Sequence, residues 1–365
     1  MVYVASVRPM FLRDRVAPVS TRVCQVTNGQ PLQVLQHWRR FLKVETSAKQ
    51  IGWIEDRATI DQNTYDGFVK LAEENKNTPV AASGTLFDDL AMHLSPGRKT
   101  PRFYLVSGNS KVELLARATA PRDSEETPAV PPSAAAAHPA KEVSKAPSKA
   151  ASRLASAPVR PSADEETAKP PAMDDWWLAR DAHGHVGWLL ANRIYVDVPD
   201  DVAQYAEGQR ILGAWVLKKV HDPDPDLPNH EIPEYLMALA APTNGLPYDY
   251  DQLRVFTWSM RHHRYETAFR LHPIAGYLPV RVLTVDTANG PVPAFRFEIA
   301  NSGSVAVNPE TGVTQPASLR TIEYEMVDTR VERMGPDLAP IASLRNPGQQ
   351  RTEKTRQRHK NRSRH

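Results

Sequence analysis

The chain has 365 residues with 32 prolines and one cysteine, so it has room for two or three domains with linkers, and an internal disulfide bond is excluded. The formal net charge of +3 comes from one end, because residues 351–365 contain seven Lys or Arg and one Glu, which leaves about −3 on the rest of the chain. This balance excludes a basic nucleic-acid-binding surface spread over the folded part, so any such activity would belong to the tail.

Residues 1–60 are predicted to form a first small β module. Strands are expected at residues 2–5, 11–13 and 22–26, with three more between Leu32 and Ile54. In this last stretch Leu32, Val34 and Trp38 are predicted to share one apolar row, and the stretch closes on Gly52-Trp53-Ile54. Cys24 lies inside a predicted strand, which favours a small buried side chain over a reactive thiol.

Residues 61–80 are predicted to be a helical linker that packs on one of the β modules. The apolar stripe of this helix is Tyr65, Phe68, Val69 and Ala72, at helical spacing. Asp61 is expected to cap the helix, and Pro79 to end it.

From residue 82 the pattern of the first module repeats, which predicts a second module over residues 81–198. The repeat is interrupted at about residues 121–171, where the sequence is rich in Ala, Pro, Ser, Lys and Glu and is predicted to be disordered. It resumes at Trp176-Trp177 and ends on Gly187-Trp188-Leu189. Because Trp176 and Trp177 are adjacent on a strand, one must point away from the module core; it is either covered by the next domain or exposed to a ligand.

Residues 199–335 are predicted to form an antiparallel β domain, a sandwich or a barrel, after a short helix at residues 199–207. Strands are expected at residues 211–220, 235–240, 253–259, 265–271, 280–285, 292–299 and 319–331. His262-His263 is expected to be a turn, and residues 336–365 a disordered basic tail.

The order of these patterns resembles that of the bacterial Src-homology-3-like (SH3b) domain, a barrel of about five strands that closes on a Gly-Trp-aliphatic step. The first copy matches from Phe11-Leu12-Arg13 through Gly29 to Gly52-Trp53-Ile54, and the second copy ends on Gly187-Trp188-Leu189. The resemblance implies a mainly β protein of two small SH3-like barrels, the second interrupted by the insert, followed by the β-rich domain.

The family resemblance further implies a non-enzymatic binding or scaffold protein of the bacterial cell envelope, with peptidoglycan or a peptide as ligand. The candidate ligand-binding aromatic residues are Tyr3, Trp38, Phe41, Trp53, Trp176 and Trp188. The alternative for these aromatics is packing in the core and rim of the barrels.

Other chemistry is weakly represented in the sequence. Asp222, Asp224 and Asp226 alternate as in a calcium loop, but the loop lacks the glycine and the closing acid that such a site needs. Adding His221, His230 and Glu231 makes a looser metal cluster conceivable, whereas His262, His263 and His272 lack zinc-ligand spacing. We therefore predict no enzyme, metal or cofactor; the alternatives are an enzyme with a site in residues 200–335 and a nucleic-acid-associated protein acting through the tail.

The sequence has no apolar run long enough to cross a membrane. No export signal is visible, because Met1 directly precedes a predicted strand. The expected location is the envelope or periplasm if an export signal precedes this chain, and otherwise the cytoplasm.

Overall fold

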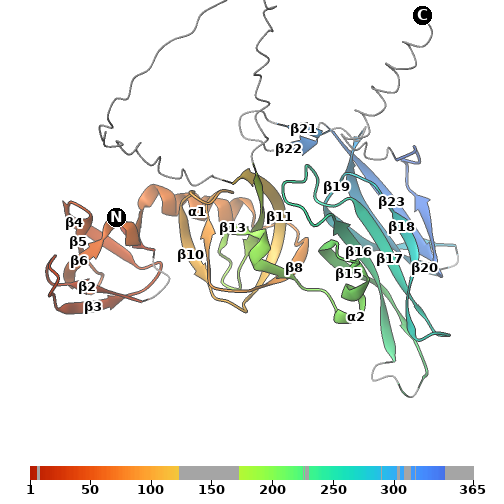
Figure 1. Ribbon diagram of the computed structural model, residues 1–365, viewed down its shortest axis with the longest axis horizontal. Helices are drawn as coiled ribbons and strands as arrows, with labels where there is room; N and C mark the ends of the chain where they lie inside the picture. Colours follow the sequence, from red (N-terminus) through yellow and green to blue (C-terminus); the bar gives the residue numbers. More distant parts are fainter. Residues whose placement is uncertain are drawn as a thin grey trace, which may run out of the picture.

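The computed structural model describes residues 1–5, 9–122, 172–224, 226, 230–288, 290–301, 305–307, 314–316 and 318–341. Almost all of the predicted insert, and the tail beyond residue 341, lie outside these residues. Three β bodies follow one another along the long axis of the molecule in the order of the sequence (Figure 1). The predicted mainly β, antiparallel fold is confirmed.

The first module is a seven-stranded antiparallel sheet with the order β3-β2-β6-β5-β4-β1-β7. Its elements are β1 (Val2–Val4), β2 (Met10–Arg13), β3 (Arg22–Val26), β4 (Pro31–Trp38), β5 (Phe41–Glu45), β6 (Ile51–Glu55), η1 (Asp56–Ala58) and β7 (Thr59–Asp61). Alternate side chains such as Leu12, Leu32, Val44 and Ile54 are buried and form the core.

The predicted apolar row of β4 is wrong beyond Leu32, because Val34 and Trp38 are exposed. Strand β4 pairs with β1 only through Pro31 and Leu32, and a bulge follows Val34. The rest of the strand therefore has a neighbour on one side only, and its side chains are not covered by the sheet.

The second module has the same strand order as the first, β10-β9-β13-β12-β11-β8-β14. Its elements are β8 (Ala82–Leu86), β9 (Leu90–His93), β10 (Arg102–Val106), β11 (Lys111–Pro121), β12 (Met173–Arg180), β13 (Val186–Leu190), η2 (Ala191–Arg193) and β14 (Ile194–Val196). The Gly-Trp step has the same cause in both modules. A Cβ added at Gly52 would lie 2.7 Å from Leu12 Cβ, and one added at Gly187 would lie 2.5 Å from Met92 Cβ, so only glycine lets these strands approach.

The hairpin of β11 and β12 shows where the two modules diverge. In the first module Trp38 pairs with Phe41 across the two-residue turn Arg39-Arg40. In the second module the corresponding pair is Ala118 and Trp176, and the two strands continue pairing as far as Pro121 and Met173. Residues 119–175 thus stand where the first module has two residues.

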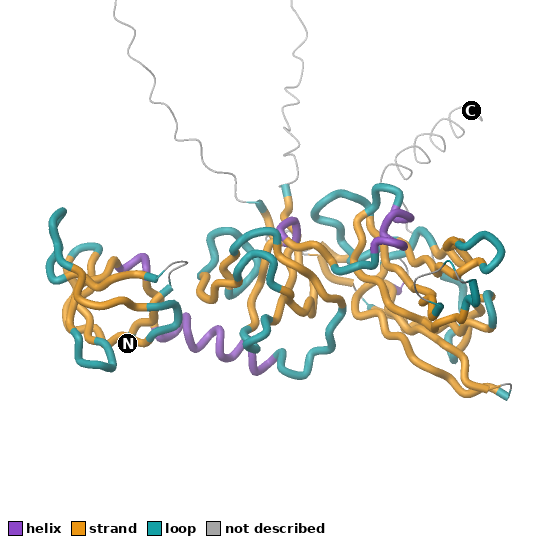
Figure 2. Tube along the Cα trace, turned by 90° about the horizontal axis from the view of Figure 1, so that it is seen from below, coloured by secondary structure: helices purple, strands orange, loops and turns teal. Residues whose placement is uncertain are grey.

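Helix α1 (Gln62–Glu74) leads from the first module to the second, as Figure 2 shows. The Asp61 side chain accepts a hydrogen bond from the Thr64 N–H, which confirms the predicted cap. The helix ends at Glu74, before Pro79, and the side-chain amide of the C-cap residue Asn75 donates to the Leu71 carbonyl at 2.9 Å. Val69 of the predicted stripe is exposed, and Leu71 packs on the second module instead.

The C-terminal domain contains two four-stranded antiparallel sheets, β15-β16-β17-β18 and β19-β20-β23-β24. Their strands are β15 (Arg210–His221), β16 (Glu231–Ala240), β17 (Gln252–Ser259), β18 (Arg264–Leu271), β19 (Gly276–Thr287), β20 (Gly290–Ala300), β23 (Leu319–Val327) and β24 (Arg330–Met334). A short ribbon of β21 (Val305–Val307) and β22 (Thr314–Pro316) lies apart from both sheets. The single strand predicted at residues 319–331 is wrong, because it is a hairpin that turns at Asp328, which has a positive φ of 55°.

The two sheets of this domain pack face to face, so of the two predicted architectures the domain is a sandwich and not a barrel. Phe269 of the first sheet contacts Phe295 and Tyr324 of the second. The other face of the first sheet is covered by α2 (Asp200–Ala203) and η3 (Gln204–Ala206), whose Val202 and Ala206 are buried against it.

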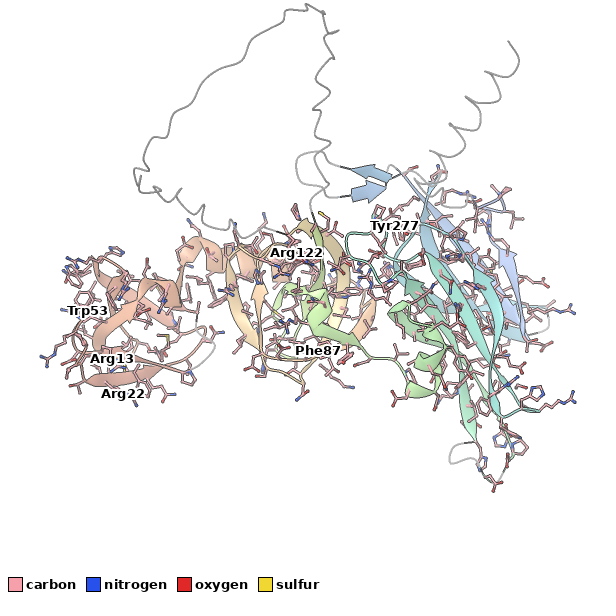
Figure 3. All side chains as sticks on the ribbon, viewed as in Figure 1. Arg13, Arg22, Trp53, Phe87, Arg122 and Tyr277 are labelled. Carbon is pink, nitrogen blue, oxygen red and sulfur yellow. The ribbon has the colours of Figure 1, made fainter. Side chains whose placement is uncertain are left out.

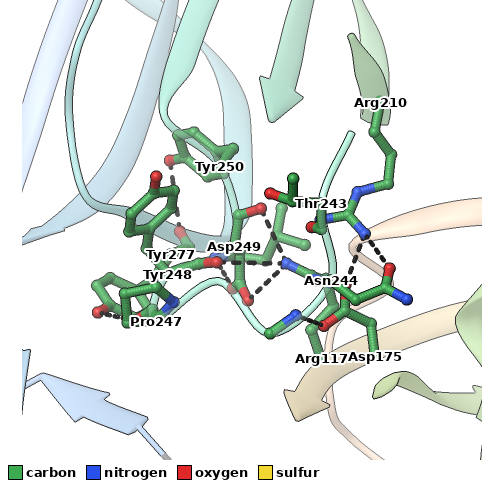
Figure 4. A network of polar contacts seen from close by, with 12 residues as sticks. Arg117, Asp175, Arg210, Thr243, Asn244, Pro247, Tyr248, Asp249, Tyr250 and Tyr277 are labelled. Atoms are coloured by element: carbon green, nitrogen blue, oxygen red, sulfur yellow. Dashed lines mark hydrogen bonds and ion pairs between the residues drawn. The ribbon is translucent and has the colours of Figure 1, made fainter. Parts of the chain in front are cut away.

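A network of charged groups joins the second module to the C-terminal domain (Figure 4). The Arg117 guanidinium is 3% exposed; it lies 3.0 Å from the Asp175 carboxylate and donates to the Asp249 carbonyl at 2.9 Å. Arg210 donates to the same Oδ2 of Asp175, and the Asp249 carboxylate accepts from the Leu278 N–H at 2.8 Å. Burial raises the pKa of Asp249, although Arg117 opposes this. Because each buried charge meets an opposite charge or an N–H donor, the two bodies are held in one defined arrangement.

Candidate functional site

A groove of about 630 Å³ lies on the first module. It lies between the loop that joins β2 to β3 and the outer side of β5 and β6. It is lined by Met10, Phe11, Arg13, Arg15, Val16, Ala17, Pro18, Ser20, Arg40, Phe41, Trp53, Ile54 and Glu55. We call it the arginine groove.

Aromatic rings form much of the surface of the arginine groove. Phe41 and Trp53 line it from adjacent strands, and Phe11 lines it from β2. Trp38 extends this surface, because its ring meets that of Trp53 edge to face with centroids 6.5 Å apart. Flat, partly exposed rings of this kind provide apolar contact area at little cost in side-chain entropy.

Arginines accompany three of these four rings. Arg22 lies over Phe11 at 4.4 Å, Arg39 over Trp38 at 5.0 Å and Arg40 over Phe41 at 5.4 Å. Figure 3 labels Arg13, Arg22 and Trp53 together on this end of the molecule.

The groove as a whole is positively charged. Its lining includes Arg13, Arg15 and Arg40 but only one acid, Glu55, which is already paired with Arg57. Guanidinium groups bind carboxylates through two parallel N–H donors, so this lining favours an anionic ligand.

The loop that forms one wall of the groove is held by its own hydrogen bonds. The Asp14 carboxylate accepts from the Thr21 N–H at 2.8 Å, and this bond lowers the pKa of Asp14. Arg13 Nη1 donates to the Ser20 carbonyl at 3.3 Å. These two bonds link the two arms of the loop to each other.

Three of the predicted ligand-binding residues come together in this region and three do not. Phe41 and Trp53 line the arginine groove, and Trp38 adjoins it. Tyr3 instead stacks on Tyr65 of α1 with ring centroids 3.8 Å apart and contributes to the packing between the modules.

The two predicted residues of the second module are covered. Trp176 is buried, with its ring 5.0 Å from that of His93, and Trp177 is buried in the core. Neither Trp176 nor Trp177 is exposed, so the predicted alternative in which one of them forms a surface for a ligand is wrong. Trp188 packs with Leu71 and Ala72 of α1, which lies over it.

Phe11 and the arginines are not among the residues predicted to bind a ligand. The sequence does contain a pattern for them, since Arg13, Arg15, Arg39 and Arg40 all fall within or beside predicted turns of one small module. Only the pairing of β2 with β6, at Arg13 and Trp53, brings the two turns to the same groove.

In the second module other side chains occupy the position that corresponds to the arginine groove. The register matches His93 to Arg13 and Trp176 to Phe41. Burial, aided by the nearby charge of Arg102, lowers the pKa of His93, so a neutral ring replaces a guanidinium. The following loop is tied down by Arg98, which donates to the buried Asp174 at 2.6 Å.

A second hollow of about 470 Å³ lies between α1 and the second module. Tyr104 and His185 stack in its wall with centroids 3.8 Å apart, and burial raises the pKa of Tyr104 to about 12. Arg180, which also lines it, is engaged by Glu113 and by the carbonyl groups at the end of α1. Arg180 is thus used in holding the end of the helix.

The acids and histidines of the 221–231 region are bonded to one another and to tryptophan. Asp222 accepts from the Trp258 indole at 2.7 Å and lies 3.2 Å from His263 Nδ1. His262 and His263 lie in the predicted turn between β17 and β18. Within the described residues no group of three or more His, Cys, Asp or Glu side chains is arranged to hold a metal ion.

No protein-family model matches the chain, and no curated protein matches it. None of the helices in the described part of the chain has the length and apolar character needed to span a bilayer.

Proposed function

We propose that the protein is a non-enzymatic binding or scaffold protein of the bacterial cell envelope, and that the arginine groove of its first SH3-like module binds a carboxylate-bearing peptide. Peptidoglycan is the ligand of first choice, because its stem peptides carry free carboxylates. The observation that carries the proposal is the combination of Phe41 and Trp53 with Arg13 and Arg40 in one open groove.

Each part of the groove has a task in this proposal. The rings contact the apolar parts of a peptide, and the arginines pair with its carboxylates. Eukaryotic SH3 grooves that read proline-rich helices need acidic side chains beside the aromatics; here that place is basic.

The shape of the C-terminal domain also supports a role without catalysis. Large side chains such as Phe295, Phe297 and Ile322 fill the space between its two sheets. A filled interior provides no space for a substrate there.

The test is co-sedimentation of the full-length protein with purified peptidoglycan at low salt, followed by titration with a soluble stem peptide. The variant Arg40→Ala/Phe41→Ala should weaken binding at least tenfold. Added salt should weaken wild-type binding, because the arginines are near the surface.

The matched control is Phe87→Ala/Arg193→Ala, which removes a half-exposed ring and an exposed arginine from the second module. This control should bind like the wild type. Absence of wild-type retention at low salt, or equal retention of the groove variant, would refute the proposal.

A further inference from the structure

The equal strand order of the two modules gives each residue of one outer face a counterpart in the other. The bulge after Val34 matches the bulge after Leu114, so Leu35 corresponds to Leu115. By the same register the pairs are Lys43 with Leu178, Glu45 with Arg180, Ile51 with Val186 and Trp53 with Trp188.

In the second module helix α1 covers this face. Leu115 is 3% exposed and Val186 is 1% exposed, and Leu71 and Ala72 of the helix pack on the same cluster. Arg180 Nη2 donates to the Asn75 carbonyl at 2.7 Å and to the Lys76 carbonyl at 3.2 Å. The face therefore binds an amphipathic helix and holds its C-terminal end by charge.

In the first module the same face is open. Leu35 and Ile51 are each 45% exposed, and Trp38 beside them is 42% exposed. Three large apolar side chains on one side of a small module mark an interaction surface. We call the surface formed by Leu35, Lys43, Glu45, Ile51 and Trp53 the open face.

The charges around the open face differ from those of its counterpart. Lys43 replaces Leu178, and Arg39 and Arg40 lie in one adjoining turn, whereas Glu45, the acid on the face, is paired with Lys49 of the other turn at 3.6 Å. The surroundings are therefore positive. Glu45 also replaces the arginine that holds the carbonyl end of α1, so a helix here is favoured with its N–H end at Glu45.

We propose that the open face of the first module docks an acidic amphipathic helix of another protein, in the direction opposite to that of α1 on the second module. A second copy of this chain fits less well, because two copies of the face would bring the same positive charges together. The α1 of another copy is also already packed on its own second module.

The probe for the test is a helix-stabilised synthetic peptide of about four turns with a Leu/Ala stripe at the spacing of α1 and Glu on its remaining surface. Binding to the full-length protein is measured by tryptophan fluorescence and calorimetry. A peptide with Lys in place of Glu should bind at least tenfold more weakly, and a scrambled acidic peptide should not bind.

The variants test the surface itself. Leu35→Ser/Ile51→Ser should weaken binding of the acidic helix at least tenfold, whereas Leu319→Ser, at a similarly exposed leucine of the C-terminal domain, should change nothing. Lys43→Glu should reverse the preference between the acidic and the basic peptide.

The proposal is overturned if the acidic helix does not bind, or if the scrambled peptide binds equally well. It is also overturned if the wild type dimerises and Leu35→Ser/Ile51→Ser abolishes the dimer, since a second copy would then be the occupant. The groove variant Phe11→Ala should leave helix binding intact, which separates this proposal from peptide binding in the arginine groove.

Discussion

The two β modules share strand order, bulge position and Gly-Trp step, but they differ in what their surfaces contact. The outer face of the second module is covered by α1, and its extended hairpin is locked to the C-terminal domain through Arg117 and Asp175. The first module leaves its outer face and its groove open, with arginines around both. The same small fold thus packs against its neighbours in one copy and leaves its outer face and groove exposed in the other.

Among the variants that test this comparison, substitution of Arg117 is expected to have the largest effect on stability. Arg117→Ala removes a cation from the buried Asp175 carboxylate and from the partly buried Asp249 carboxylate, and it should cost about 3–5 kcal/mol of unfolding free energy. His37 occupies the corresponding exposed position of the first module, so His37→Ala should change stability by less than about 0.5 kcal/mol. Urea unfolding followed by tryptophan fluorescence measures both; equal effects would mean that the lock has no energetic role.

The next effect concerns the leucine pair at the bulge. Leu115→Ala opens a cavity under α1 and should cost about 2–4 kcal/mol. Leu35→Ala, at the corresponding position on the open face, should cost less than about 0.5 kcal/mol, because 45% of the surface of Leu35 is exposed to solvent. Thermal unfolding of both variants measures these stability costs. A large loss of stability in Leu35→Ala would show that this face is covered in solution.

A smaller effect is expected from pH. Burial alone raises the pKa of Asp174, but hydrogen bonds from Arg98 and Arg122 outweigh it, and the pKa is lowered. A carboxylate with a lowered folded pKa stabilises the protein above its unfolded pKa of about 3.9, and this stabilisation is lost as the pH falls through the folded value. Wild type should therefore lose more stability below about pH 4 than Asp174→Asn, which has no such group to protonate. Parallel pH profiles of urea unfolding test this, and identical slopes would contradict it.

The smallest expected effect is a difference in the quenching of tryptophan fluorescence between the two modules. Trp38 is exposed among arginines, whereas Trp176 and Trp177 are buried. Iodide, an anion, should quench the fluorescence of the wild type more than that of Trp38→Phe, and Trp38→Phe should alter stability by less than about 0.5 kcal/mol. Trp176→Phe is the matched control, which should leave the quenched fraction of the emission unreduced.

Most strands of the three β bodies could be predicted, because alternating side chains and turn dipeptides are local properties, but β7, β8 and β14 were not among them. The errors are also local in origin. Val34 and Trp38 follow the apolar alternation of β4, yet they are exposed because β1 stops pairing with β4 at Leu32. The sequence does not reveal this point. Val69 follows the helical stripe, but the second module contacts the helix on the side of Leu71.

The candidate site was predicted in part. Phe41 and Trp53 were found from the Gly-Trp step and its partner strand, while Arg13 and Phe11 depend on the pairing of β2 with β6. Tyr3 and Trp176 lie outside the groove, because an aromatic residue on a strand has the same local pattern whether another element covers it or not.

By itself the sequence determined the mainly β class, the repeated order of strands, the cap of α1 and the place of the insert, since each depends on side chains near one another in the chain. Only the tertiary structure decided which outer face is covered, which arginines meet in one groove, and that Asp175 and Arg117 join two bodies. These features depend on contacts between residues far apart in sequence, whose burial follows from how the whole chain packs.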